Sequence, residues 1–169
     1  MSGLSITSYF PFPRIKIIKQ TVVEKTSVIE VQPDLRFNPI CAECGSRGNG
    51  IHDHHSRRVR DMNIGDYQVY LDYHYRRIEC PQCQRATIEE LGIVAPYVRI
   101  TRRLASHIHH LCKKMTVQDV ADELHLDWKT VKNTDKEFLE RQFGKAFLRM
   151  REANQWAEQT ISEIFHDEL

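Results

Sequence analysis

Hydrophobic and more polar residues alternate along much of the first half of the chain, with the period of two that is typical of β-strands. The clearest case lies within residues 67–78, where two interleaved sets occur: Val69, Leu71, Tyr73 and Tyr75, and Tyr70, Asp72, His74 and Arg76. This alternation predicts a strand with one apolar side and one polar side.

Two segments nearer the start, residues 14–24 and 27–31, are rich in isoleucine and valine. The polar Glu24-Lys25-Thr26 lies between them, so they predict two antiparallel strands joined by a turn. Shorter strand-like pieces occur at residues 57–61 and at Thr87-Ile88. The first half of the chain is therefore predicted to be β-rich.

The periodicity changes at Thr101, a candidate N-cap, after which apolar residues recur at the three- and four-residue steps of amphipathic helices. Helices are predicted over residues 102–114, 116–124, 128–142 and 147–165. The expected fold class is α+β: a β-rich module in residues 1–95, a helix-turn-helix module in 96–143 and a C-terminal amphipathic helix in 144–169. Cys112 lies on the apolar stripe of the first helix and is predicted to be a core residue.

The start signals of the second and third helices indicate a helix-turn-helix unit. Thr116 and Asp119 have the spacing of a capping box, and Asp127 is placed to cap the third helix. His125 occupies the turn position that usually holds glycine, where the backbone must be left-handed. In such a unit the start of the third helix enters the major groove of DNA.

The exposed side chains at the start of this third helix are the candidate DNA contacts: Trp128, Lys129, Thr130, Lys132, Asn133 and, one turn later, Lys136. Lysine can reach phosphate or guanine, asparagine can pair with adenine, and threonine can touch a thymine methyl group. The alternative is a solvated polar face in an ordinary three-helix bundle, with Trp128 packed against another part of the chain.

Two cysteine pairs, Cys41/Cys44 and Cys80/Cys83, have the C-x-x-C spacing with which one tight turn directs two thiolates at one metal ion. Positions 45 to 79 place 35 residues between the pairs, which exceeds the usual zinc-ribbon gap of roughly 15 to 20 and leaves room for an inserted hairpin. Four thiolates complete a structural zinc site, so the β-rich residues 1–95 are expected to form a four-cysteine zinc finger. Such a site would stabilise a module with a small core. The alternative is two unrelated pairs, redox-active or unpaired.

Charge is unevenly distributed, although 24 Lys and Arg against 23 Asp and Glu give a net charge of only +1. Basic doublets occur at 57–58, 76–77, 102–103 and 113–114, whereas acidic residues gather toward the end. This distribution predicts a polyanion-binding face on the middle of the chain, with Arg57 and Arg58 among its DNA contacts.

Histidines form two further clusters. The stretch His52-Asp53-His54-His55 is expected to be a phosphate-facing polar loop rather than a second set of metal ligands, because four thiolates already close the zinc site. His107, His109 and His110 are expected on a mildly basic helix face. The sequence contains no phosphate-binding glycine-rich loop and no Ser/His/Asp set, and it shows neither a signal peptide nor a membrane-spanning stretch.

Several segments form a specific combination: Cys41-x-x-Cys44-Gly45-Ser46, Arg58-Val59-Arg60-Asp61-Met62-Asn63-Ile64-Gly65, Arg76-Arg77-Ile78-Glu79-Cys80 and 87–91, followed by 115–121 and 128–132. In this order they resemble the zinc finger and helix-turn-helix of the ISL-three family of bacterial insertion-sequence transposases. The similarity covers about residues 15–143.

The resemblance implies binding of double-stranded DNA, at the terminal inverted repeats of a transposable element. Family members continue into a ribonuclease-H-like domain whose acidic triad cuts DNA. Its first acidic motif is absent after the helix-turn-helix here, so this chain is predicted not to be an enzyme by itself. The alternative is a regulatory module that dimerises with a second copy or with full-length transposase. Either protein would act in the bacterial cytoplasm, at the nucleoid.

Overall fold

The computed structural model describes residues 10, 12–48, 50–94 and 98–144. The chain divides into two compact units, Met1–Leu104 and Ala105–Leu169, each of which is described by itself below. The predicted domain boundary at residue 95 lies earlier in the chain and stays a prediction. The predicted helix over 147–165 lies outside the described residues.

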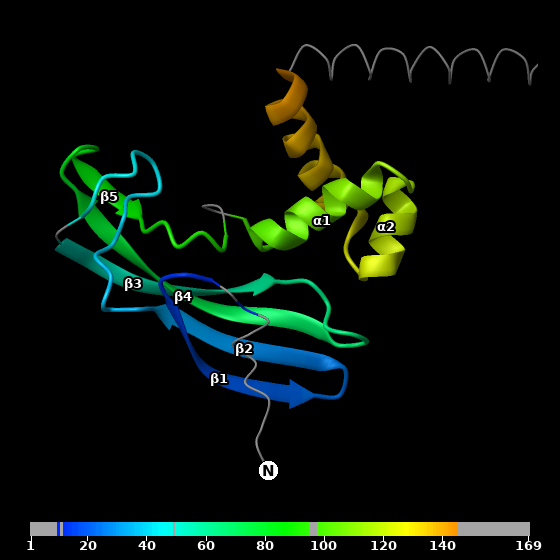
Figure 1. Cartoon of the computed structure of the whole chain (residues 1–169), viewed down its shortest axis with the longest axis horizontal. Coiled ribbons are helices and arrows are strands. Elements are labelled where there is room, and N and C mark those ends of the chain that lie inside the picture. Colours follow the sequence, from blue (N-terminus) through cyan, green and yellow to red (C-terminus); the bar gives the residue numbers. More distant parts are fainter. Residues whose placement is uncertain (1–9, 11, 49, 95–97, 145–169) are drawn as a thin grey trace, which may run out of the picture. The chain divides into compact units, whose positions relative to one another are not determined.

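The first unit is built on a five-stranded sheet, drawn from blue to green in Figure 1. The strands are β1 (Ile15–Val23), β2 (Thr26–Pro33), β3 (Gly50–Arg60), β4 (Gln68–Cys80) and β5 (Arg85–Ile88). Their order is β1-β2-β4-β3, and β5 also pairs with β4. The predicted antiparallel pair near the start is confirmed as β1 and β2. The predicted hairpin between the cysteine pairs is confirmed as β3 and β4.

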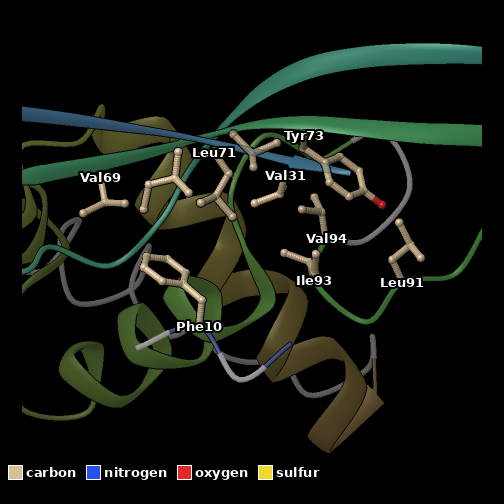
Figure 2. Close-up of a cluster of buried hydrophobic side chains, with 10 residues drawn as sticks. Phe10, Val31, Val69, Leu71, Tyr73, Leu91, Ile93 and Val94 are labelled. Carbon is tan, nitrogen blue, oxygen red and sulfur yellow. The ribbon is translucent and has the colours of Figure 1, made fainter. Parts of the chain in front are cut away.

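Strand β4 lies at the centre of this sheet and contributes to two separate cores. Val69, Leu71 and Tyr73 are fully buried and pack with Ile29 and Val31 of β2. Figure 2 shows Val31, Val69, Leu71 and Tyr73 on the side of the sheet that faces Phe10, Ile93 and Val94. Beyond Tyr75 the buried positions change to Arg76, Ile78 and Cys80. Side chains at even and odd positions of a strand point to opposite faces. The buried face of β4 therefore changes between Tyr73 and Arg76.

Two sequence-based expectations for this region are wrong. Arg76 was expected on the polar side of its strand but is buried, because the apolar side changes within β4. His52 to His55 belong to β3 rather than to a loop. Asp53, His54 and His55 pair with Arg77, Arg76 and Tyr75 of β4, and His52 lies at a register shift. Both features depend on strand pairing that alternation within one segment does not encode.

Arg60 and Asp61 of the family-like Arg-Asp motif have structural roles. The Asp61 carboxylate is completely buried and accepts hydrogen bonds from the Thr101 hydroxyl (2.7 Å) and the Arg103 guanidinium. The Arg60 guanidinium donates to the carbonyls of Asp61 (2.6 Å) and Val69 (3.1 Å). These bonds fix the turn between β3 and β4 and hold residues 101–103 beside it.

Three helices follow: α1 (Arg102–Cys112), α2 (Val117–Leu124) and a helical run over residues 128–144. The Thr116/Asp119 capping box is confirmed, and Thr101 caps α1 by accepting from the Leu104 N–H. His125 has the predicted left-handed backbone (φ 52°, ψ 50°). Asp127 accepts from the Lys129 N–H at 2.9 Å, as expected of an N-cap. The apolar residues buried in this unit include Ile108, Val120, Ala121, Leu124 and Val131.

The expectation that three histidines of α1 form a basic face is wrong for His109. Its side chain is buried, its Nδ1 lies 2.8 Å from Oδ1 of Asp135, and its ring stacks on Phe138 with a centroid distance of 4.9 Å. His109 therefore joins α1 to the helix over 128–144 instead of facing solvent.

Candidate metal centre and nucleic-acid interface

The four cysteines lie on two turns with the same local geometry. In each turn the residue after the second cysteine, Gly45 or Gln84, has a positive φ, and its N–H donates to the carbonyl of the first cysteine. The thiols of Cys41 and Cys80 also accept backbone N–H groups, from Glu43 and Cys83 respectively, both at 3.4 Å. Each turn therefore folds both of its sulfur atoms toward the same point.

The two turns bring all four Sγ atoms within 4.8 Å of one another. The Cys41–Cys83 and Cys44–Cys80 sulfur distances are 3.8 and 3.5 Å. A tetrahedral ion with Zn–S bonds of about 2.3 Å requires S–S distances of about 3.8 Å. Cys41 and Cys80 are buried, whereas Cys44 is exposed. The donor set and its geometry fit a structural zinc ion.

Two hydroxyl groups adjoin the sulfur atoms. The Ser46 Oγ lies 3.0 Å from the Cys44 sulfur and 3.2 Å from the Cys80 sulfur, and the Thr87 Oγ1 lies 3.1 Å from Cys41. Sequence reasoning missed both residues, although Ser46 directly follows the first cysteine pair in Cys-x-x-Cys-Gly-Ser. Such second-layer donors orient metal ligands and stabilise their charge.

These hydrogen bonds alter the acidity of the thiols. The bond from Ser46, partly opposed by burial, lowers the pKa of Cys80 to about 6. Burial alone would raise the pKa of Cys41, but bonds from Thr87 and from backbone N–H groups lower it overall. Hydrogen bonding with Cys44 raises the pKa of Cys83. Full deprotonation of all four thiols requires a cation among them, which is why metal binding to such a cluster releases protons.

A buried ion pair lies next to the first cysteine turn. Arg76 Nε and Nη2 donate to Glu89 Oε2 and Oε1 at 2.6 and 2.5 Å, and both side chains are almost inaccessible to solvent. Glu89 also forms a backbone bridge with Cys41. This pair therefore connects the first cysteine turn to the middle of β4.

The candidate DNA contacts on the third helix share one solvent-facing side. Lys129, Lys132, Asn133 and Lys136 are exposed, whereas the intervening Val131 is buried and Thr130 is half-buried. Trp128 is 41% exposed, and the Lys132 Nζ lies 4.9 Å from its ring centroid. The structure thus brings these residues together on one helix, while their contacts with DNA stay a prediction.

Arg57 and Arg58 do not form a common basic surface. The Arg57 guanidinium lies over the rings of Tyr73 and Tyr75, at 5.6 and 5.2 Å from their centroids. Arg58 lies on the other face of β3 and makes a bidentate pair with Asp72, at 2.7 and 2.9 Å. The expectation that basic doublets build one face is therefore wrong here, because neighbouring strand residues point to opposite sides. A DNA contact by either arginine remains a prediction.

A β-rich module with a zinc-type cysteine cluster, followed by a capped helix-turn-helix, defines a zinc-finger DNA-binding protein. Two family models match this chain: the zinc-finger of transposase IS204/IS1001/IS1096/IS1165 over residues 38–83, and the helix-turn-helix domain of transposase family ISL3 over residues 89–138. These matches support the N-terminal zinc-finger and helix-turn-helix part of an ISL3-family transposase, so the predicted resemblance is confirmed.

The chain is 40% identical over 97 residues to the transposase for insertion sequence element IS1001 of Bordetella parapertussis. This alignment covers 57% of the chain and 24% of the relative, so the chain spans about a quarter of the relative's length. No solved structure matches the chain. Among the described residues, no helix is both long and apolar enough to cross a membrane.

Proposed function

We propose that this chain is the zinc-dependent, sequence-specific DNA-binding part of a transposase, which recognises terminal inverted repeats and does not cut DNA by itself. The observation that carries the proposal is the exposed polar face of the helix over 128–144, which follows a capped turn within a matched helix-turn-helix domain.

The exposed residues of this helix are proposed to contact different parts of the DNA, according to their chemistry and their position along the helix. Asn133 and Lys129 read base edges in the major groove, where a good bidentate contact discriminates by about 1–3 kcal/mol. Lys136, one turn further from the helix start, holds a phosphate. Trp128, braced by Lys132, packs against the edge of the groove.

Zinc has a structural role in this proposal, held by Cys41, Cys44, Cys80 and Cys83. Four thiolates leave no coordination position for a water molecule or a substrate. The ion therefore joins the two cysteine turns and supplies no chemistry on DNA. The proposed setting is the bacterial cytoplasm, at the nucleoid, where the chain meets its DNA.

The test begins by selecting duplexes from a random library with the zinc-loaded wild-type chain and comparing them with inverted repeats flanking the gene. Binding of Lys129→Ala, Asn133→Ala and Lys136→Ala to selected and scrambled duplexes is then measured by anisotropy. The first two should weaken only the selected duplex, by about 5- to 150-fold. Lys136→Ala should weaken both equally and reduce the log-salt slope by about 1. Gln142→Ala, exposed near the far end of the helix, is the control.

Equal losses on both duplexes for Asn133→Ala would show that this helix does not read sequence. The regulatory alternative, which binds a second copy or full-length transposase, predicts salt-insensitive self-association without sequence-selective DNA binding. Intact strands after incubation of the complex with Mg²⁺ are expected, since this chain is proposed to bind without cutting.

A further inference from the structure

A pocket of about 280 Å³ lies on the sheet unit beside the first cysteine turn. One wall is Ala42-Glu43, the two residues between the first pair of cysteines. Another part of its lining consists of His55, Tyr75 and Arg77 from β3 and β4. The lining residues all belong to the first unit, Met1–Leu104.

Three rings form a stack that ends at the pocket. Tyr73 and Tyr75 are stacked with centroids 5.5 Å apart and planes at 18°, and Tyr75 and His55 follow at 5.7 Å and 24°. The Arg57 guanidinium packs on both tyrosines and holds them in place. Tyr73 at one end is buried, whereas the His55 side chain at the other end is 44% exposed. The stack is therefore rigid at its base and open at the pocket.

Charged side chains that pair with one another line or adjoin the pocket. Asp53 lies 3.1 Å from both the Arg77 Nη1 and the His55 Nε2, so one carboxylate orients the guanidinium and the outermost ring. Glu43 pairs with Arg85 at 2.5 Å. The pocket thus presents a planar ring face, a hydrogen-bond donor and a carboxylate acceptor. These are the groups that recognise a nucleobase, which stacks on rings and bonds through its edges.

The charges around the pocket argue for a base rather than for phosphate alone. Arg77 and Arg85 each lie against a carboxylate, Asp53 and Glu43 respectively, so the charges are matched. A site with matched charges binds its ligand through stacking and hydrogen bonds more than through a net electrostatic attraction. The faces of bases are covered inside a duplex, so the ligand must be unpaired.

We propose that this pocket binds an unpaired nucleotide of the DNA, stacked on His55 and Tyr75. The proposal rests on the proposed DNA-binding function and adds a second class of DNA contact, made by the zinc-bearing module. In this proposal the first cysteine turn has a role in binding, because zinc bound to Cys41 and Cys44 would hold Ala42 and Glu43 in position at the pocket.

The experiment uses the full, zinc-loaded chain with a short single-stranded oligonucleotide and a blunt duplex selected by the wild-type chain. His55→Ala should weaken single-strand binding by about 5- to 150-fold, the range for loss of one base–aromatic stack, and leave duplex binding unchanged. His55→Phe should restore single-strand binding, since it keeps the ring. Ser56→Ala, exposed on the other face of β3, should change neither. The log-salt slope should be shallower for the single strand than for the duplex.

Absence of single-strand binding by the wild-type chain overturns the proposal, and so does full single-strand binding by His55→Ala with unchanged circular dichroism. If Lys129→Ala abolishes binding of both DNAs equally, the single strand occupies the recognition helix and this site is refuted. Failure of duplex selection with retained single-strand binding would instead refute the proposed function and leave the pocket supported.

Discussion

Two arginine–glutamate ion pairs near the cysteine turns differ chiefly in burial. Both have a closest N–O distance of 2.5 Å. The Arg76 and Glu89 side chains are 4% and 1% exposed, whereas those of Arg85 and Glu43 are 67% and 45% exposed. Replacing each arginine by methionine removes the charge and keeps an unbranched side chain, so the two substitutions form a matched comparison.

Burial sets the expected magnitudes. Arg76→Met leaves the Glu89 carboxylate buried without its partner, which destabilises a protein by about 3–5 kcal/mol. Arg85→Met leaves a solvated carboxylate, and exposed pairs of this kind contribute about 0–1 kcal/mol. A domain is stable by only about 5–15 kcal/mol, so the first change removes a large part of the total. The double variant Arg76→Met/Glu89→Met should recover most of the loss, because no charge then stays buried.

Intrinsic fluorescence can follow the two units separately during urea denaturation with zinc present. All six tyrosines lie at or before residue 97, and both tryptophans lie after residue 104. Arg76→Met should therefore shift the tyrosine transition to lower urea and leave the tryptophan transition in place. The argument is refuted if Arg76→Met costs no more than Arg85→Met, or if the double variant is less stable than Arg76→Met.

Three other perturbations have definite expected outcomes. Chelation of zinc or Cys80→Ser should unfold the residues before about 95 and leave the helices largely formed; far-ultraviolet circular dichroism checks this, and an unchanged β signal without metal would contradict it. Ser46→Ala should lower zinc affinity about 10- to 100-fold, measured by competition with a chromophoric chelator, whereas Ser56→Ala on exposed β3 should not. His125→Gly should stabilise the helical unit by about 1 kcal/mol, because glycine adopts the left-handed backbone without steric cost; a lower midpoint of the tryptophan transition would argue against this.

The features that could be predicted from sequence depend on neighbours close along the chain. The C-x-x-C spacing predicts two sulfur atoms converging from one turn, and both turns have that geometry. The Thr116/Asp119 box and the Asp127 cap are bonds across two or three residues, and both are formed. Alternation correctly predicted the buried face formed by Val69, Leu71 and Tyr73.

The tertiary structure decided which charged and polar side chains are buried and which partners they contact. Asp61 and Arg103 are 42 residues apart, and His109 and Asp135 are 26 apart, yet each pair is joined by a hydrogen bond within one unit. Nothing local distinguishes buried Arg76 from half-exposed Arg77, which both belong to a basic doublet. Their roles differ because strand pairing aims Arg76 at Glu89 and Arg77 at Asp53.

The sequence by itself therefore determined the kinds of element, the metal-binding chemistry and the helix that carries the candidate DNA contacts. The fold alone decided that β4 changes its buried face, that Arg57 and Arg58 separate, and that His55, Tyr75 and Arg77 gather at one pocket. The physical reason is that periodicity and caps act over one turn or one pleat. The role of a charged or aromatic side chain depends on which residue, distant in sequence, the fold places beside it.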